Sequence, residues 1–575
     1  MNNYMEEYRH WMDSPSLSES EWKELDEIAN DEEEMKSRFF APLEFGTAGL
    51  RGIMGMGLNR MNRHVIRHAT QAFASVICAE GEDAKKNGVI ICYDCRENSE
   101  LFARSAASVM AANGIFVRIF DEMRPTPELS FAIRKYGAIA GINVTASHNP
   151  KEYNGYKVYW ADGAQLPPKH AQAIADAMSR IDIFTSIKRM LFTEAVDKGL
   201  VETLGAETDE DFLQNVLSQS IDREVVARVT DKFKIVYTPF HGAGHKLVPE
   251  ALRRLGIKNV IPVPQQMVID GTFPTVKSPN PEEPAGFHLA IDLAKRENSD
   301  LIIGTDPDSD RVGIMVRDEK GEFVPVTGNQ TGVLLLDYII NARKKADTLP
   351  ENAAAIKTIV TTEMAREVAQ QNGVHIDDTF TGFKFMAEKI AEYEKTNSFS
   401  YIMAYEESYG YMIGDYVRDK DAVTASMLIA EMAAHYFEKG MTLLQAMDSL
   451  YEKYGYYAEK TLNLVMPGID GLEKMQRLMS RLRENPPVEI SGVKVLRERD
   501  YASGKIIVPG LGLVDKTHIV GSNVLYFELD DDTSFIVRPS GTEPKIKIYI
   551  LVSGESKQDC AEKIDKYVLY AQNLK

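Results

Sequence analysis

The chain has 575 residues, of which 44% are hydrophobic and 26% are charged, as is ordinary for a globular protein. This length predicts about three to five domains, with enough apolar residues for several cores. The net charge of −19 argues against nonspecific nucleic-acid binding, which needs a basic surface, but it allows anionic small-molecule substrates because a site can be locally basic.

Neither end of the sequence nor its interior predicts a membrane or secretory segment. The first residues are polar and acidic, so we expect no signal peptide. The apolar stretch at Val333–Ile340 is too short to span a membrane and is interrupted by Asp337. Four cysteines are too few for a disulfide scaffold, and a strand-to-loop transition is favoured over a redox pair for Cys92 and Cys95. These features predict a cytoplasmic protein.

In chain order, residues 1–40 are acidic and predict solvated helices. Short apolar runs then alternate with helical patterns, which predicts a mostly parallel sheet covered on both faces. The first block comprises strand Val89–Tyr93, helix Ser99–Asn113, strand Ile115–Phe120, helix Pro125–Tyr136 and strand Ala138–Val144.

The same order of elements recurs twice. The second block comprises strand Phe233–Tyr237, helix Lys246–Leu255, strand Val260–Val263, helix Gly286–Arg296 and strand Leu301–Ile303. The third comprises strand Ala354–Val360, helices Met364–Gln371 and Phe383–Thr396, and strand Tyr401–Tyr405.

The end of the chain differs from these blocks and predicts a smaller α+β domain. Its expected elements are strand Leu462–Met466, helix Leu472–Glu484, strands Val524–Glu528, Phe535–Val537 and Ile546–Val552, and a closing helix from Lys557.

In each of the three blocks a buried-looking strand leads directly into a polar cluster. The clusters are Thr145–Pro150, Gly304–Asp310 and Tyr405–Gly410. Ligands of open α/β sheets bind beyond the carboxyl ends of the strands, so we expect the three loops to serve one shared cleft.

The second cluster predicts a metal site. Asp306, Asp308 and Asp310 are spaced i, i+2, i+4, which places their side chains on one face of an extended segment. Three such carboxylates repel one another unless a cation neutralises them, and hard oxygen ligands favour Mg²⁺ or Ca²⁺. An EF-hand is excluded because its Gly and Glu positions hold Arg311 and Arg317. A solvated acidic turn is the less favoured alternative.

Ser147 is the candidate nucleophile in the first cluster, and His148 follows it. The context is Thr-Ala-Ser-His-Asn rather than the G-x-S-x-G of serine hydrolases, so that class is disfavoured. Taken alone, this segment is more typical of a turn capped by its Ser and Asn side chains than of a nucleophile. Lys157 offers a titratable amine, although a surface lysine on a β-segment explains it as well.

Two further segments are candidates for phosphate binding. Arg538–Lys545 combines an arginine, two hydroxyls and a glycine, a set that can grip a phosphate. It is no Walker A loop, and a turn between two strands is an equally good interpretation. Gly46–Gly52 is flexible and contains Arg51. His241 and His245 have metal-like spacing, but the glycines between them favour a loop and a helix start.

Four of these segments together resemble the signature loops of the α-D-phosphohexomutase superfamily, the phosphoglucomutase/phosphomannomutase enzymes. They stand in that family's order: Thr145–Pro150, Asp306–Arg311, Glu406–Gly410 and Arg538–Pro544. The resemblance runs from Phe45 to the end of the chain. It implies four domains around a central cleft, three related mixed α/β units and a smaller C-terminal α+β domain, for which we set the ranges 1–212, 213–325, 326–458 and 459–575.

The resemblance also implies roles for individual residues. Ser147 would be a phosphoserine, with Arg51, His148 and Lys157 near it and Lys157 as general acid/base. Mg²⁺ would be bound by Asp306, Asp308, Asp310 and an oxygen on Ser147. Substrate would be bound by Arg311, Thr381, Gly382, Glu406, Ser408, Lys420, Arg538, Ser540, Gly541 and Thr542.

The resemblance is closest to the glucose-preferring branch, which interconverts glucose 1-phosphate and glucose 6-phosphate through glucose 1,6-bisphosphate. Glu406–Gly410 reads Glu-Glu-Ser-Tyr-Gly, whereas dual-specificity enzymes tend to have Glu-Met-Ser-Gly-His. Phe45–Gly52 resembles a subgroup that includes phosphopentomutases and a glucose 1,6-bisphosphate synthase. Phosphomannomutase, phosphopentomutase, N-acetylglucosamine-phosphate mutase or bisphosphate synthase activity, or a catalytically silent sugar-phosphate-binding regulator, are the alternatives. The expected partners are sugar phosphates, with no nucleic acid or membrane and a monomer or homodimer.

Overall fold

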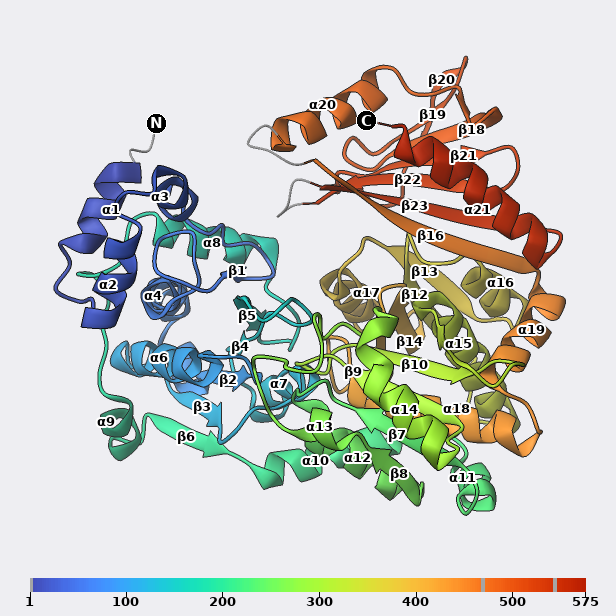
Figure 1. Ribbon diagram of the computed structural model, residues 1–575, viewed down its shortest axis with the longest axis horizontal. Coiled ribbons are helices and arrows are strands. Elements are labelled where there is room, and N and C mark those ends of the chain that lie inside the picture. The colour runs from blue at the N-terminus through green and yellow to red at the C-terminus, as the bar shows by residue number, and fades with distance from the viewer. Residues whose placement is uncertain (1–3, 467–470, 541–544, 575) are drawn as a thin grey trace. The chain divides into compact units, whose positions relative to one another are not determined.

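The computed structural model describes residues 4–466, 471–540 and 545–574 (Figure 1). The chain divides into two compact units. The first comprises residues 1–326 and 409–442, and the second comprises residues 327–408 and 443–575.

Three short helices open the first unit: α1 (Tyr4–Met12), α2 (Glu19–Glu27) and α3 (Glu32–Phe39). A capping box formed by Ser18 and Glu21 starts α2. The expected helices are present, but the expectation that they are solvated holds for only part of their surface. Tyr8 and Trp11 on α1 and Phe39 on α3 are buried, because apolar residues recur at helical spacing among the charges and form one packed face.

These helices lie beside α4 (Arg63–Ala79), as Figure 1 shows in blue. The Trp11 ring lies 5.8 Å from the rings of Phe39 and His64 and 5.2 Å from that of Phe184, measured between centroids. The N-terminal helices therefore belong to the main hydrophobic core of the first unit.

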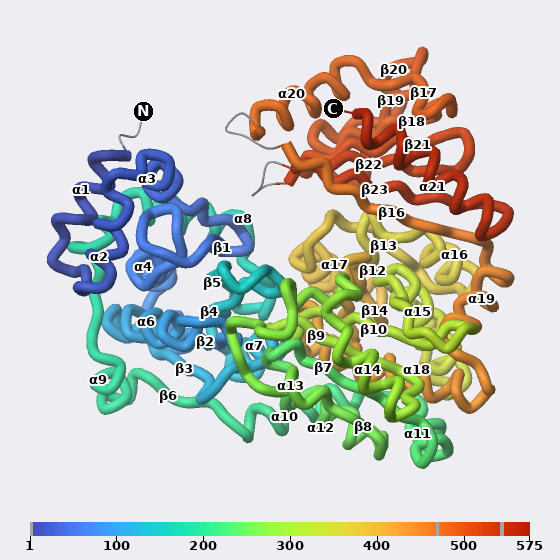
Figure 2. Tube along the Cα trace, in the orientation of Figure 1, coloured from blue at the N-terminus to red at the C-terminus, as the bar shows by residue number. Residues whose placement is uncertain are grey.

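The first sheet of this unit has six strands in the order β1-β5-β4-β2-β3-β6. Their bounds are β1 Leu50–Ile53, β2 Val89–Tyr93, β3 Val117–Phe120, β4 Ala140–Val144, β5 Tyr153–Trp160 and β6 Val201–Leu204. Strands β4, β2, β3 and β6 run parallel, whereas β5 is antiparallel to both β4 and β1. Figure 2 traces β2, β3 and β4 lying side by side.

Helices cover both faces of this sheet, as predicted. Alternate residues of β2 enter different cores: Val89, Ile91 and Tyr93 join the core that includes α4 and α6. Ile90 and Cys92 join the core that includes α7. The helices around the sheet are α5 Glu82–Asn87, α6 Ser99–Ala112, α7 Thr126–Tyr136, α8 Pro168–Met178 and α9 Phe192–Asp197.

The second sheet of the first unit has the order β11-β10-β9-β7-β8. Its strands are β7 Lys234–Thr238, β8 Asn259–Pro262, β9 Leu301–Thr305, β10 Val312–Arg317 and β11 Phe323–Val326. Strands β8, β7 and β9 are parallel, and β10 turns back antiparallel to β9. Strand β10, which was not predicted from the sequence, forms the far side of the hairpin around residues 306–311.

The remaining elements of the first unit are mostly helices. They are α10 Ala206–Ser218, α11 Arg223–Val229, α12 Gly244–Leu255, α13 Pro264–Met267, the 3₁₀ turn η1 Pro284–Phe287, α14 His288–Glu297, strand β15 Gly410–Met412 and α18 Ala422–Glu438. The helix start expected near His245 is confirmed, since α12 begins at Gly244.

The second unit contains a parallel sheet ordered β13-β12-β14. The strands are β12 Ala353–Thr358, β13 His375–Thr379 and β14 Ser400–Glu406, and the accompanying helices are α15 Gly328–Lys345, α16 Met364–Gln371, α17 Phe383–Thr396 and α19 Leu443–Tyr454. A capping box of Thr327 and Gln330 starts α15.

A larger antiparallel sheet completes the second unit, which confirms the expected C-terminal α+β architecture. Along it run β16, β23, β22, β21, β18, β19 and β20, and β17 pairs with β18. The bounds are β16 Tyr456–Val465, β17 Glu489–Ile490, β18 Val493–Asp500, β19 Lys505–Val508, β20 Gly512–Lys516, β21 Leu525–Leu529, β22 Ser534–Pro539 and β23 Lys545–Gly554, with helices α20 Gly471–Glu484 and α21 Lys557–Gln572.

Strand β16 is longer than the expected Leu462–Met466 because it pairs with β23 along its whole length, from Tyr456 opposite Gly554 to Val465 opposite Lys545. No helix among the described residues is long and apolar enough to cross a membrane. The four domain ranges proposed from the sequence stay a prediction.

Replacing the buried indole tests whether the N-terminal helices stabilise the fold. We expect Trp11→Ala to lower the free energy of unfolding by about 3–5 kcal/mol, because it leaves a large cavity in the core. Trp22→Ala is the matched control, since that indole is 44% exposed. It should change stability by less than about 0.5 kcal/mol. Urea unfolding followed by far-ultraviolet circular dichroism measures both, and equal effects would contradict the packing described.

Candidate active site

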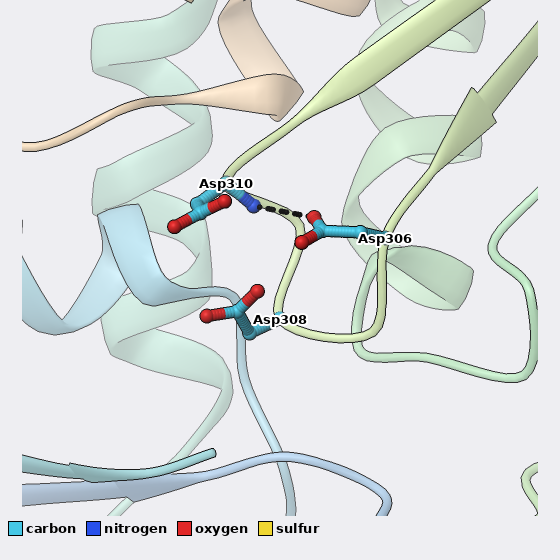
Figure 3. Close-up of side chains that lie close together, drawn as sticks. All are labelled: Asp306, Asp308 and Asp310. Carbon is cyan, nitrogen blue, oxygen red and sulfur yellow. Dashed lines mark hydrogen bonds between the residues drawn. The ribbon is translucent and has the colours of Figure 1, made fainter. Parts of the chain in front are cut away.

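The acidic trio lies in the turn between β9 and β10, where Thr305 pairs with Val312. Asp306, Asp308 and Asp310 are 0%, 0% and 1% exposed, and each offers an oxygen within 4.8 Å of the others. Figure 3 shows the backbone N–H of Asp310 donating to Asp306 Oδ1, at 3.1 Å. The turn therefore folds its three carboxylates into one buried group rather than leaving them in solvent.

Burial and mutual repulsion dominate the electrostatics of this turn. Burial, together with the charges of Asp308 and Asp310, holds the pKa of Asp306 well above its usual value. Burial also opposes ionisation of Asp310, but Lys420 and Lys157 outweigh it and lower the pKa of that carboxyl. The protein itself therefore neutralises only part of the negative charge of the three carboxylates.

Two buried lysines supply that partial neutralisation. Lys157, on β5, places Nζ 2.6 Å from Asp308 Oδ2 and 3.3 Å from Asp310 Oδ2. Lys420 places Nζ 3.2 Å from Asp310 Oδ2. Burial alone would lower the pKa of Lys157, but Asp308 and Asp310 raise it above the usual value, so Lys157 carries its proton in this arrangement.

Two carboxylate oxygens of the trio are available to bind a cation. Asp308 Oδ1 and Asp310 Oδ1 are buried and accept no hydrogen bond among the described residues. Buried carboxylate oxygens without partners are costly unless an ion takes their lone pairs. An all-carboxylate donor set suits a hard divalent cation such as Mg²⁺ and leaves its other positions open. The residues present therefore fit a metal site.

Ser147 lies against this trio although it is 159 residues away in sequence. Its Oγ donates to Asp306 Oδ2 at 2.9 Å, and it lies 3.2 Å from His148 Nδ1. Ser147 is 3% exposed and has φ +51°, a left-handed conformation that non-glycine residues seldom adopt. Burial, with Arg311 and Arg51 nearby, holds the pKa of His148 well below its usual value, so this imidazole is neutral near pH 7.

Two arginines flank the serine and the trio. Arg51, exposed on β1, donates to Asn149 Oδ1 at 2.9 Å and so contacts the serine loop. Arg311 donates to Glu282 Oε1 at 2.9 Å, and its Nε lies 3.8 Å from Asp310 Oδ1. The structure thus gathers nine of the predicted residues in the first unit: Arg51, Ser147, His148, Lys157, Asp306, Asp308, Asp310, Arg311 and Lys420.

Two further residues at this site, Thr126 and Asp419, were not predicted from the sequence. Thr126, at the start of α7, donates from Oγ1 to Asp308 Oδ2 and from its N–H to the Asp308 carbonyl, both at 2.8 Å. Asp419 Oδ1 lies 3.1 Å from Lys420 Nζ, and its Oδ2 accepts hydrogen bonds from Tyr159 and Gln165. Nothing local in the sequence indicates Thr126, whereas the charged run around Lys420 could have indicated Asp419.

The predicted sugar-binding residues lie in the second unit. Glu406, at the end of β14, accepts a hydrogen bond from the Gly382 N–H at 2.5 Å. Gly382 has φ +113°, which a residue with a Cβ adopts only under strain. Thr381 precedes it. Glu407 accepts from the hydroxyls of Thr358 and Thr361 at 3.3 and 3.2 Å, and Ser408 follows at the end of this segment.

The predicted phosphate loop leaves the end of β22. Arg538 pairs with Lys547 of β23, and the Ser540 N–H donates to the Lys545 carbonyl at 2.8 Å. Gly541 and Thr542 lie outside the described residues. Arg538 and Ser540 therefore lie at the end of β22, and Lys545 begins the antiparallel β23.

Comparison with known proteins establishes the family. Models of the phosphoglucomutase/phosphomannomutase α/β/α domains I, II and III match residues 42–183, 210–321 and 327–454. A phosphoglucomutase of Staphylococcus haemolyticus is 35% identical over 92% of this chain and 94% of its own length. One of Staphylococcus saprophyticus is 34% identical over 96% of this chain and 98% of its own length.

Solved structures share the fold. The pp63/parafusin phosphoglucomutase from Paramecium, in its open form, covers 92% of this chain and 96% of its own with a TM-score of 0.65 at 19% identity. A phosphoglucomutase/phosphomannomutase family protein from Burkholderia thailandensis covers 92% and 97% with a TM-score of 0.65 at 17% identity. The chain has the fold of an α-D-phosphohexomutase. It belongs to the phosphoglucomutase/phosphomannomutase family.

Replacing one carboxylate tests the metal site in two ways, because it should weaken Mg²⁺ binding but stabilise the metal-free protein. We expect Asp306→Asn to weaken Mg²⁺ binding by more than about 10-fold, measured by titration calorimetry with MgCl₂ alone. In metal-free protein the same change should raise the thermal midpoint, because it relieves repulsion among buried carboxylates. Asp176→Asn, at an exposed position on α8, is the control and should alter neither. Unchanged Mg²⁺ affinity in Asp306→Asn would contradict the assignment.

Proposed function

We propose that the protein interconverts glucose 1-phosphate and glucose 6-phosphate through a phosphorylated Ser147 and a glucose 1,6-bisphosphate intermediate. The observation that carries the proposal is the Ser147 hydroxyl held 2.9 Å from a carboxylate of the buried acidic trio. A hydroxyl beside a site for a divalent cation is the arrangement that phosphoryl transfer requires. The phosphoglucomutase names of the staphylococcal relatives support glucose as the sugar.

Mg²⁺ is the proposed cofactor. Asp306, Asp308 and Asp310 would hold it together with an oxygen on Ser147, and it would neutralise charge on the transferring phosphoryl group. Arg51, next to the serine loop through Asn149, and Arg311, beside Asp310, add positive charge from the protein.

Lys157 is the residue proposed to transfer protons. Its Nζ is buried beside Asp308 and Asp310 and carries a proton, so it can donate to an oxygen that gains charge as the phosphoryl group leaves. The neutral His148 ring, 3.2 Å from Ser147 Oγ, can exchange a hydrogen bond with the hydroxyl without adding charge.

The bonds balance without any co-substrate. In the first half-reaction the P–Oγ bond of phospho-Ser147 breaks and a P–O6 bond to glucose 1-phosphate forms, while O6 loses its proton and Ser147 Oγ gains one. In the second, the P–O1 bond of the bisphosphate breaks and the P–Oγ bond re-forms, while Oγ loses its proton and O1 gains one. Between the two steps the bisphosphate must turn around, so one set of binding residues must accept either end of the sugar.

Residues of the second unit are proposed to provide that binding. Glu406 and Ser408, with Thr381 and Gly382, would take the sugar hydroxyls, and the Gly382–Glu406 hydrogen bond already joins these two segments. Arg538, Ser540, Gly541 and Thr542 would bind the phosphate that is not reacting, and Lys420 is a further candidate for phosphate binding. We further propose a cytoplasmic monomer or homodimer whose partners are sugar phosphates alone.

Removing the hydroxyl of Ser147 is the direct test. We expect Ser147→Ala to lower the rate of glucose 6-phosphate formation by at least about 1000-fold, because no phosphoenzyme can form. The measurement is a coupled dehydrogenase assay with glucose 1-phosphate, Mg²⁺ and trace glucose 1,6-bisphosphate. Ser75→Ala, at an exposed position on α4, is the matched control. Parallel assays with mannose 1-phosphate and ribose 1-phosphate separate the sugar alternatives, and bisphosphate that accumulates from a glycolytic phosphate donor would indicate a synthase instead.

The phosphate-binding role of Arg538 has its own test. Losing a charge-assisted hydrogen bond to phosphate costs about 1.5–3 kcal/mol. We therefore expect Arg538→Ala to lower kcat/KM for glucose 1-phosphate by about 10- to 100-fold. Arg497→Ala is the control, since that arginine is half exposed on β18 of the same sheet and pairs with Glu528. A wild-type rate at low substrate in Arg538→Ala would contradict the loop assignment.

A further inference from the structure

The turn that follows β2 holds a buried arginine that contacts the serine loop. Arg96 is 3% exposed and sits in the segment where the sequence drew attention to Cys92 and Cys95 instead. Its guanidinium donates to the carbonyl oxygens of Ser147, Asn149, Pro150 and Tyr153, at 2.5–3.0 Å. One side chain thus gathers four backbone carbonyls from the strand-to-strand loop that carries the nucleophile.

Only a guanidinium can make this set of bonds. Its donors lie in one plane with fixed directions, whereas a lysine ammonium is a single point with three donors. The two bonds from Nη2 reach Ser147 and Asn149, and the two from Nη1 reach Pro150 and Tyr153. Carbonyls from four residues between 147 and 153 therefore surround the guanidinium, so the arginine fixes the loop backbone at several points.

Asp94 holds the other side of the same loop. Its Oδ1 accepts from the Arg96 N–H at 2.9 Å and from Ser99 Oγ at 2.8 Å. Its Oδ2 lies 3.2 Å from Arg96 Nε and accepts from Thr145 Oγ1 at 2.6 Å, and that hydroxyl in turn accepts from the Ser147 N–H at 2.9 Å. Ser147 is thus tied through its N–H and through its C=O, on both sides of its left-handed backbone.

The loop between α13 and η1 packs against Arg96. The Phe273 ring lies 5.0 Å from the guanidinium carbon and is 2% exposed. At Gly271 a Cβ would come within 2.5 Å of the Cys95 carbonyl and 2.6 Å of the Glu97 N–H, so only glycine allows this approach. The guanidinium is therefore fixed in its plane by an aromatic ring on one side and by carbonyls at its edge.

We propose that Arg96, supported by Asp94 and Phe273, is the positioning residue that sets the Ser147 hydroxyl against the acidic trio. Arg96 acts on the backbone of the loop and not on the substrate. Its catalytic consequence rests on the proposed function, whereas its effect on the loop does not. Misplacing a nucleophile by about 1 Å is enough to cost about 100-fold in rate.

The test compares Arg96→Lys with Arg60→Lys. Arg60 is a buried arginine of the same unit that bonds to Ser37 and Asn59 and not to the serine loop. Hydrogen exchange followed by mass spectrometry reports on the peptide that spans residues 145–153 in metal-free protein. We expect exchange there to accelerate at least about 10-fold in Arg96→Lys and to stay at the wild-type rate in Arg60→Lys.

Kinetics give the second readout. In Arg96→Lys we expect kcat for glucose 1-phosphate to fall about 100-fold while KM changes less than about threefold, because the substrate-binding groups are untouched. Phe273→Leu keeps every bond of the guanidinium and removes only the ring behind it. We expect Phe273→Leu to show the same split between kcat and KM, with a smaller fall in kcat. It replaces Arg96→Lys in the test if Arg96→Lys does not fold.

The outcomes separate the positioning role from the proposed function. Unchanged exchange of the 145–153 peptide in Arg96→Lys and Phe273→Leu, or a loss confined to KM, would overturn the positioning role. Faster loop exchange in an Arg96 variant of a protein whose wild type converts no glucose 1-phosphate would support the positioning role and reject the proposed mutase activity.

Discussion

The burial of three carboxylates in one turn is the constraint on which the rest of this structure depends. Asp306, Asp308 and Asp310 have almost no solvent to stabilise their charge. Charged groups out of water require partners, and the cost of leaving them unpaired is several kcal/mol. The first unit meets this requirement with Lys157 from β5 and Lys420 from the segment before α18, and two carboxylate oxygens are left over for a cation.

Meeting that requirement brings distant parts of the chain together. The β9–β10 hairpin presents the trio, Ser147 lies in the loop between β4 and β5, and α7 begins with Thr126 bonded to Asp308. Ser147 and the trio lie in loops that follow strands, and Thr126 begins a helix, whereas Lys157 lies within β5. Two sheets and the segment before α18 therefore supply the hydroxyl, the acidic group and its counter-charges.

Much of the fold and of the candidate site could be predicted from the sequence, because the apolar periods and motifs that indicate them are local in the chain. The period of apolar residues predicted the central strands and helices of the three α/β blocks, such as β2 at Val89–Tyr93, but not strands β5, β6, β11 and β13. The i, i+2, i+4 spacing predicted the acidic trio. The long β16 and the antiparallel β10 were not predicted, since their extent depends on pairing with β23 and β9 rather than on their own composition.

The sequence by itself determined the family, the succession of α/β blocks and the residue types that carry the proposed chemistry, since motif order and apolar periodicity are written along the chain. Only the tertiary structure decided which residues act on which. Thr126 supports Asp308 and Arg96 holds the serine loop, through a contact between segments far apart in sequence and through backbone carbonyls, whereas the family resemblance already implied that Ser147 lies with the trio. A carbonyl carries no side-chain identity, so no sequence pattern could have indicated the role of Arg96.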